Sequence, residues 1–355
     1  MKQIKFNYLF IALAFATVLA SCHKDKLAPT TDTPTAQRAG LYILNQGVFG
    51  SNNSTLTYYD YTSKALTADI FFSANNAKLG DTGNDLGIYG SKMFIIVNNS
   101  NVIDIANAKG SKLIKQITLY QPRSVIFYKN NAFVTSYSGT VSVIDTTSLT
   151  ITKTITVGNN PEQMVISNGK LYVANSDGYN VGPTTTSATI SVIDPVALTV
   201  TKTITGVLVD PVTLAADVYG HVYALSLGNF ASIGPGMTII NNVTDAVTST
   251  ASLNLPYNIP ITISGDFAYY FTADNKIAVY NTKTQAIAQA NFITDGTTIT
   301  TPYAITVDDV SGEVFITDAK DYNSNGTLYA FDKTGKKEYS LTVGISPGKI
   351  TLINK

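Results

Sequence analysis

Few side chains in this sequence are suited to covalent or metal chemistry. Its 355 residues include two histidines, His23 and His221, and one cysteine, Cys22. Neither histidine has a plausible partner nucleophile, so we expect no Ser-His-Asp triad, Cys-His pair or histidine metal site. Gly234-Pro-Gly236 is typical of a bend and not of a phosphate-binding loop. We therefore expect a protein that binds a ligand without turning it over, with no catalytic residues and no resident cofactor.

One segment imitates the first half of a calcium-binding loop. Asp321, Asn323 and Asn325 alternate with other residues and are followed by Gly326. Residues 329–332 belong to an expected strand, however, and a strand cannot curl back around an ion. A plain connecting loop is therefore favoured over a calcium site.

The N-terminus has the layout of a bacterial lipoprotein signal. Lys2 and Lys5 precede an apolar run over residues 8–19, which is too short to span a membrane. Leu19-Ala20-Ser21-Cys22 resembles a lipobox, in which the peptide bond before the cysteine is cut and the thiol is lipidated. The alternative is an ordinary signal peptide followed by a chance cysteine, but a lone exposed thiol in an oxidising compartment would be a liability. We expect a signal peptide over 1–21, a lipidated Cys22 within a flexible tether over 22–39, and a folded domain over 40–355.

The folded domain repeats a unit of four short β-rich runs. The third run of each unit ends in Asp or Asn, which is expected to close a tight turn. These marks lie 40 to 51 residues apart, at Asp60, Asp104, Asp145, Asp194, Asn241, Asn281 and Asp332. Four strands in each unit of this length are the signature of a propeller blade, so the sequence predicts an all-β, seven-bladed β-propeller.

The two ends of the domain complement each other. Residues 347–354 form a first strand with no blade after it, and the segment from Gly40 to Asn45 forms a second strand with no first strand before it. The C-terminal strand is therefore expected to complete the N-terminal blade and to remove an open sheet edge.

The blade motifs resemble a known group of propellers. Val141-Ser-Val-Ile-Asp145 followed by Thr154-Ile-Thr-Val-Gly158-Asn-Asn-Pro161 is similar to the YncE-type propellers. The opening Leu41-Tyr-Ile-Leu-Asn-Gln-Gly47, with Asn53-Ser-Thr-Leu-Thr-Tyr-Tyr-Asp60, resembles the BtuG group of Bacteroidota surface lipoproteins. That resemblance implies an outer-membrane, surface-exposed lipoprotein that captures a cobalamin-type corrinoid above a TonB-dependent transporter. The sequence by itself is equally compatible with a lipoprotein that faces the periplasm.

Two sets of loops should surround the channel on one face of the propeller. They join the second strand to the third and each blade to the next, and they are rich in Asn and Tyr with few charges. Aromatic rings and amides suit a large, polar, largely uncharged ligand, such as a corrinoid or a glycan. The candidate ligand-binding residues on this face are Asn45, Phe49, Asn52, Asn53, Asn84, Asp85, Asn98, Arg123, Tyr137, Glu162, Asn175, Tyr179, Asn180, Phe230, Tyr257, Asn258, Tyr303, Asp318 and Tyr322.

Arg123 is expected to be the sole arginine of the propeller, since Arg38 falls in the predicted tether. Its guanidinium offers a rigid fork of donors to a ligand carbonyl or phosphate. Alternatively it forms an internal ion pair with a neighbour such as Glu162.

The charge balance excludes some partners. The chain has 24 basic and 24 acidic residues, and removal of the two lysines in residues 1–21 leaves a net charge of −2. Such a surface is not expected to bind nucleic acid or to adhere to an anionic membrane without its lipid anchor. The first hypothesis is ligand capture for an outer-membrane transporter. The alternatives are a glycan- or protein-binding module of the cell envelope and, least favoured, a lactonase- or lyase-like enzyme.

Overall fold

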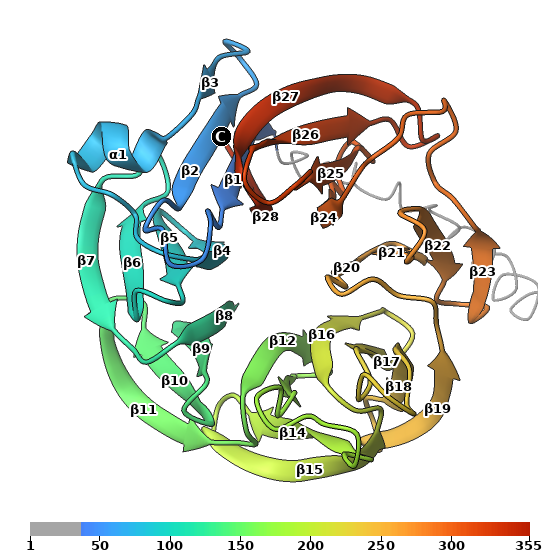
Figure 1. Cartoon of the computed structure of the whole chain (residues 1–355). Coiled ribbons are helices and arrows are strands. Elements are labelled where there is room, and N and C mark those ends of the chain that lie inside the picture. The colour runs from blue at the N-terminus through green and yellow to red at the C-terminus, as the bar shows by residue number, and fades with distance from the viewer. Residues whose placement is uncertain (1–36) are drawn as a thin grey trace, which may run out of the picture. The chain divides into compact units, whose positions relative to one another are not determined.

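The computed structural model describes residues 37–355, which form seven four-stranded antiparallel sheets arranged around a channel (Figure 1). The expected signal peptide, Cys22 and nearly all of the expected tether lie outside the described residues. Within residues 37–355, no helix is long and apolar enough to cross a membrane. The predicted seven-bladed propeller is confirmed.

Within each blade the strands run outward from the channel in a fixed order. Blade 1 contains β28 (Pro347–Asn354), β1 (Arg38–Asn45), β2 (Thr55–Asp60) and β3 (Leu66–Thr67). Blade 2 contains β4 (Gly83–Tyr89), β5 (Lys92–Val97), β6 (Val102–Asn107) and β7 (Leu113–Thr118). Blade 3 contains β8 (Pro122–Tyr128), β9 (Asn131–Ser136), β10 (Thr140–Asp145) and β11 (Thr150–Thr156). Blade 4 contains β12 (Pro161–Ser167), β13 (Lys170–Asn175), β14 (Ala188–Asp194) and β15 (Thr199–Val207).

The remaining three blades follow the same order. Blade 5 contains β16 (Pro211–Ala216), β17 (His221–Ser226), β18 (Gly236–Asn241) and β19 (Ala246–Ser252). Blade 6 contains β20 (Ile261–Ser264), β21 (Phe267–Phe271), β22 (Ile277–Asn281) and β23 (Ala286–Gln289). Blade 7 contains β24 (Pro302–Val307), β25 (Val314–Asp318), β26 (Asn325–Phe331) and β27 (Lys337–Ile345).

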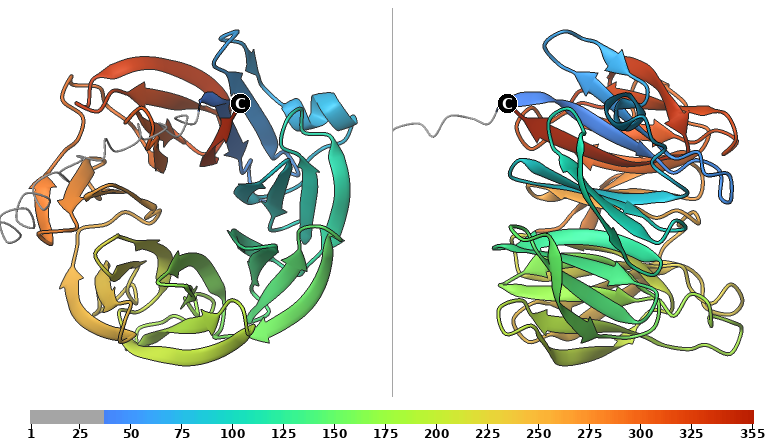
Figure 2. Two further views of the ribbon diagram at one scale, coloured as in Figure 1. Left: turned by 180° about the vertical axis from the view of Figure 1, so that it is seen from behind. Right: turned by 90° about the vertical axis from the view of Figure 1, so that its left-hand side faces the viewer.

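The ring is closed by the C-terminal strand, as the sequence predicts. β28 pairs antiparallel with β1 from Arg38 opposite Asn354 to Asn45 opposite Pro347. β28 therefore starts at one face of the ring and ends at the other, where β1 begins. Both ends of the described chain lie at that second face, and the side view in Figure 2 shows the C-terminus there.

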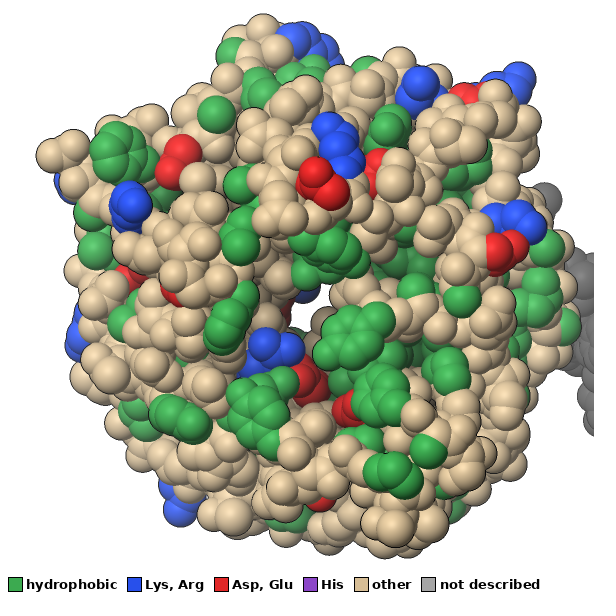
Figure 3. Space-filling view, viewed as in Figure 1, with side chains coloured by type: hydrophobic (Ala, Val, Ile, Leu, Met, Phe, Trp, Pro, Cys, Tyr) green, Lys and Arg blue, Asp and Glu red, His purple; other side chains and the backbone are tan. Residues whose placement is uncertain are grey.

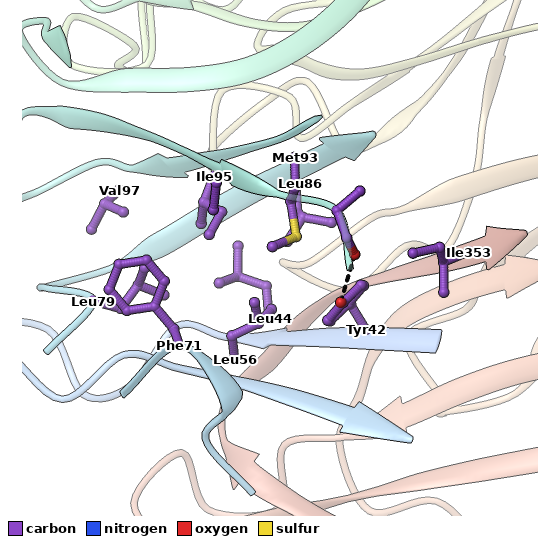
Figure 4. Close-up of a cluster of buried hydrophobic side chains, with 12 residues drawn as sticks. Tyr42, Leu44, Leu56, Phe71, Leu79, Leu86, Met93, Ile95, Val97 and Ile353 are labelled. Carbon is purple, nitrogen blue, oxygen red and sulfur yellow. Dashed lines mark hydrogen bonds between the residues drawn. The ribbon is translucent and has the colours of Figure 1, made fainter. Parts of the chain in front are cut away.

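Burial follows from the position of each strand within its blade. The second strands lie between neighbouring blades and are apolar on both faces, so that Met93 to Val97 of β5 are fully buried. In the outer strand β11 only Ile155 is buried. Figure 4 shows how blades 1 and 2 pack, with Leu44 and Ile353 facing Leu86 and neighbouring residues of blade 2. The hydroxyl of the buried Tyr42 donates a hydrogen bond of 2.7 Å to the carbonyl of Ala108.

The acid after the third strand closes a turn, as predicted. Oδ1 of Asp145 accepts hydrogen bonds from the backbone N–H groups of Thr147 and Ser148, at 3.0 and 2.6 Å. Asp104 is the exception. It lies inside β6, where its carboxylate accepts from Gln116 at 2.8 Å, and Asn107 ends the strand three residues later. The Ile-Asp pattern predicts the end of this strand three residues too early, because Ile105 and Ala106 continue the buried strand as far as Asn107.

Blade 1 departs from the four full strands that the repeat predicts. Its outer strand β3 has only two residues and is followed by helix α1 (Ile70–Asn75). The carboxylate of Asp69 caps this helix by accepting from the N–H of Phe72 at 3.1 Å, and Phe71 is buried against the blade. The helix thus covers the side of β2 that a longer outer strand would occupy.

Arg38 corrects the expected boundary of the tether and the expectation of a single arginine in the propeller. It is the first residue of β1, because Asn354 of β28 extends far enough to pair with it. Its Nη2 lies 2.8 Å from Asp308 and 3.8 Å from Asp309. The hydrogen-bonded carboxylate of Asp308 raises the pKa of the Arg38 guanidinium, and this effect outweighs burial, which opposes the charge. The ion pair ties the start of the propeller to the turn after β24.

Closure by β28 predicts a stability difference between two isoleucines. Ile350 is 3% exposed and packs with Leu41 and Ile43. Replacing it with alanine should therefore lower the free energy of unfolding by about 2–4 kcal/mol, measured by urea denaturation. The matched control is Ile114→Ala in the outer strand β7, where Ile114 is 45% exposed and the loss should stay below about 1 kcal/mol. Equal losses would contradict the structural role of β28.

Candidate functional site

Each inner strand carries a residue beside the channel at the same end of the ring. In six of the seven described blades, the pairing of the inner strand with the second strand is interrupted just after its first residue. Such a β-bulge re-aims the unpaired side chain. In blade 6 the inner strand starts later and the segment before it takes this place. The residues set around the channel in this way are Asn84, Arg123, Glu162, Val212, Tyr303 and Gly348, and Asn258 takes the corresponding place in blade 6.

A cavity of about 320 Å³ opens at the centre of this face, and all seven of these residues line it. Figure 3 shows the hollow, with basic, acidic and hydrophobic side chains gathered around it. The structure brings together ten of the nineteen predicted residues here. They are Asn84, Asp85, Arg123, Tyr137, Glu162, Tyr179, Phe230, Tyr257, Asn258 and Tyr303.

Arg123 is held by three neighbours at the cavity wall. Its Nε lies 2.9 Å from Oε2 of Glu162, and its Nη1 donates to Oδ1 of Asn84 at 2.7 Å. Its guanidinium carbon lies 4.8 Å from the ring centroid of Tyr137, whose hydroxyl donates to Glu162. Burial disfavours the charge, but the Glu162 carboxylate together with Tyr137 and Tyr179 outweighs this effect and raises the pKa of Arg123. The internal ion pair is therefore present, while the side chain stays 22% exposed at the cavity.

The residues next to this ring connect the blades. Asp85 lies 2.8 Å from Nζ of Lys349, and its other oxygen accepts from Ser124 Oγ and the N–H of Val125, both at 2.9 Å. Burial alone would raise the pKa of Asp85, but Lys349 and these hydrogen bonds hold it below its usual value. Blades 1, 2 and 3 are thus joined at the cavity wall, which makes its polar groups rigid.

Aromatic side chains form the rim. The rings of Tyr137 and Tyr179 meet edge to face at 5.2 Å, and those of Tyr303 and Tyr322 at 5.6 Å. The Tyr303 hydroxyl donates to Oε1 of Gln46 at 2.6 Å, and burial raises its pKa to about 12. Tyr179 is 68% exposed, so part of the rim is available for stacking.

Several of the other predicted polar residues have structural roles instead. The amide of Asn45 donates to Thr57 at 2.9 Å, and Oδ1 of Asn175 accepts from the N–H of Gly158 at 3.0 Å. Asn98 donates to the carbonyl of Pro122 at 3.1 Å, and Asp318 accepts from the N–H groups that precede β24. Asn53 accepts from the N–H of Val48 within its own loop. A buried amide at a strand end completes hydrogen bonds that the sheet leaves open, and sequence composition cannot distinguish this role from ligand binding.

The remaining predicted residues lie on loops and do not line the cavity. Asn52 has a left-handed backbone with φ of 51°, and Asn180 donates to Asp177 in a loop turn. Phe49 is 75% exposed, and Tyr322 is 46% exposed and packs against Tyr303 of the cavity lining.

Asp210 is the main cavity residue that the sequence analysis missed. It is 4% exposed, has φ of 59°, and immediately precedes Pro211 at the start of β16. The sequence marks its position but not its burial: Gln121, Asn160 and Ser346 likewise precede a proline that starts an inner strand, and in the structure each of them has a positive φ. Burial, and then the charges of Glu162 and Asp177, raise the pKa of Asp210 to about 7.

Asp321 and His221 both have local partners. Oδ1 of Asp321 accepts from the N–H groups of Asn323 and Ser324 at 3.0 and 2.7 Å, while Asn325 begins β26. Among residues 37–355 no cluster of three or more His, Cys, Asp or Glu residues could hold a metal ion. His221 begins β17, and its Nδ1 lies 2.8 Å from Oδ2 of Asp217.

Comparisons with known proteins identify the family and the fold. A family model described as "Domain of unknown function (DUF5074)" matches residues 39–344. No curated protein sequence matches the chain.

Several solved structures have a similar fold. They include a quinonprotein alcohol dehydrogenase-like protein from Bacteroides thetaiotaomicron, with a TM-score of 0.64 and 17% identity over 88% of this chain and 78% of that chain. Hydrazine synthase from Kuenenia stuttgartiensis has a TM-score of 0.63 and 16% identity over 77% of this chain and 95% of that chain. Apo AztD from Citrobacter koseri has a TM-score of 0.57 and 13% identity over 90% of this chain and 98% of that chain. At these identities the likeness shows the propeller fold alone.

The raised pKa of Asp210 predicts a pH-dependent stability penalty. The folded protein holds this proton up to about pH 7, whereas the unfolded chain releases it near pH 4. The penalty is therefore complete above pH 7 and decreases as the pH falls toward 4. Asp210→Asn should stabilise the protein by about 1–3 kcal/mol at pH 8 and by much less at pH 5, measured by thermal unfolding.

The matched control for this experiment is Asp309→Asn, because the Asp309 side chain is 83% exposed. Its effect on the melting temperature should be small and similar at both pH values. A pH-independent effect of Asp210→Asn would contradict the assigned burial and charge repulsion.

Proposed function

The chain belongs to the family described as "Domain of unknown function (DUF5074)", and on that premise we propose that it captures a polar, largely uncharged ligand at the central cavity without turning it over. The observation that carries the proposal is the group around Arg123. Glu162, Asn84 and Tyr137 fix the guanidinium before a ligand arrives, so little side-chain entropy is lost on binding.

The surrounding groups favour hydrogen bonding and stacking. Arg123 is paired with Glu162, and Asp85 with Lys349, so the main opposite charges of the wall already neutralise each other. A ligand of high net charge would disturb these pairs. Amides and hydroxyls of the ligand can instead form hydrogen bonds with the polar side chains of the wall. The exposed ring of Tyr179 offers an aromatic face for stacking.

The first candidate ligand is a cobalamin-type corrinoid, and the support for it is the likeness of residues 41–60 to the BtuG group. The volume of about 320 Å³ is at the low end for ligand pockets. A ligand as large as a corrinoid would insert only part of its structure and rest on the aromatic rim. A glycan would use the same amides and rings and is the alternative.

We further propose that Cys22 carries the lipid anchor and that the ligand passes to a TonB-dependent outer-membrane transporter. Residue 37 leads into β1 at the face opposite the cavity, since β1 begins where β28 ends. A lipid anchor upstream of residue 37 is thus attached to the face opposite the cavity, and this attachment favours a cavity mouth that stays accessible to the ligand.

Titration of the mature protein carrying Cys22→Ser tests ligand capture. Cyanocobalamin should bind with a Kd in the micromolar range or below, and Arg123→Ala should weaken binding at least tenfold because a charge-assisted contact is lost. Lys64→Ala, in the turn after β2 and outside the cavity lining, should leave the Kd unchanged. Thermal unfolding confirms that each variant is folded.

The outcomes of the titration separate the candidates. Binding of a member of a glycan panel but not of cyanocobalamin assigns the cavity to the glycan. Failure of both ligands up to millimolar concentration contradicts the proposed capture function.

Metabolic labelling tests the anchor. The full-length protein expressed in a bacterial host should incorporate an alkyne fatty acid and fractionate with membranes, and Cys22→Ser should lose the label and appear in the soluble fraction. Labelling that persists in the serine variant would place the lipid on another residue.

A further inference from the structure

A second hollow of about 410 Å³ adjoins the central cavity on the same face. It lies between the loop after β17 and the connection from blade 5 to blade 6, and its lining is almost wholly apolar, including Ile233, Pro235 and Leu255. Leu227, Phe230 and Tyr257 line both hollows, so the polar cavity and the apolar one are continuous. A molecule bound in the first can reach into the second.

The two aromatic rings at the boundary are presented to solvent. Phe230 is 65% exposed and Tyr257 is 79% exposed. Phe230 also has a left-handed backbone with φ of 55°, which is costly for a bulky side chain. A strained, exposed aromatic residue persists only where its surroundings fix it, and such positions are concentrated at binding sites.

Asn229 supplies that fixation. It is 1% exposed, and its Oδ1 accepts from the N–H groups of Ala231 and Ile233 at 3.1 and 2.8 Å. Its amide donates to the carbonyl of Thr185 in the loop of the neighbouring blade at 3.1 Å. The loop is therefore built to hold Phe230 in place, independently of any core packing by the phenyl ring.

The geometry of the pair suits a flat guest. The ring centroids of Phe230 and Tyr257 lie 6.5 Å apart with an interplanar angle of 33°. Two rings that enclose a third at van der Waals contact need about 7 Å between them. A small rotation of either exposed side chain would reach that separation.

We propose that Phe230 and Tyr257 form an aromatic clamp for a planar, apolar ring of the same ligand whose polar part binds at Arg123. This inference rests on the proposed capture function and specifies the ligand class. The ligand combines a flat unsaturated ring system with hydrogen-bonding groups at one end. The flat part lies between the two rings and over Leu255, and the polar part points to the central cavity.

A pair of small probes with the same carbon skeleton tests the clamp on the mature protein carrying Cys22→Ser. The planar 2-naphthoate should bind about tenfold more tightly than the puckered decahydro-2-naphthoate, because only the planar ring can stack. Ligand-observed NMR titration gives both dissociation constants.

Variants of the same protein identify the residues. Phe230→Asn suits the left-handed backbone, and Phe230→Leu keeps apolar bulk without a ring; both should abolish the preference for the planar probe, as should Tyr257→Ala. The matched control is Phe49→Ala, which removes another exposed phenyl ring that lies outside both hollows. It should leave the tenfold preference intact.

The results distinguish the clamp from the capture function itself. Equal binding of the two probes, or a preference that survives loss of the Phe230 ring, overturns the clamp. So does failure of 2-naphthoate to bind while cyanocobalamin or a glycan still binds in an Arg123-dependent manner, and in that case the capture function stands. If none of these ligands binds, both the clamp and the capture function are contradicted.

Discussion

The pairing of β28 with β1 is the constraint on which the rest of the structure depends. Without it, β1 would present an unpaired edge to the channel, and blade 7 would lose its contact with Ile350. The same pairing completes the site. Lys349 of β28 neutralises Asp85, and Gln46, directly after β1, holds the hydroxyl of Tyr303. The strand pair that closes the fold therefore also completes the wall of the cavity.

The fold could be predicted from sequence because its signals are local and repeated. Four β-rich runs, a turn-closing acid and complementary ends recur often enough for one error, at Asp104, to leave the blade count unchanged. Helix α1 could not be predicted from the repeat, since it replaces an outer strand in a single blade. The tether boundary was misplaced at Arg38 because its partner Asp308 is 270 residues away in sequence.

The candidate site was predicted less well, for a physical reason. Side-chain amides at strand ends can form hydrogen bonds with the sheet or with a ligand, and composition does not distinguish the two. Asn45 and Asn84 look alike in the sequence, although of these two only Asn84 lines the cavity. Arg123 satisfies both interpretations that the sequence left open, since it pairs internally and faces the cavity. Asp210 was missed because its environment arises from three separate segments of the chain, which bring Glu162 and Asp177 near it.

Two kinds of rigidity meet at the proposed site. The polar wall is fixed by ion pairs and hydrogen bonds between blades, as at Asp85. The aromatic boundary is fixed from beneath by Asn229, which leaves the ring of Phe230 free of packing constraints. The polar part of the proposed site thus belongs to the propeller itself, whereas Phe230 of its apolar part stands on a loop.

Because of the bulges at the inner strands, side chains that line the cavity differ from those that maintain the pairing of the sheets. A bulged residue such as Val212 takes no part in the regular pairing of its strand, so its side chain can change while the sheet keeps its register. Six of the seven described blades contribute such a position, in blade 6 the segment before β20 takes its place, and neighbouring positions come from different hairpins. A substitution at a bulge without an interblade ion pair, such as Val212, can therefore change the lining of the cavity while the strands keep their pairing.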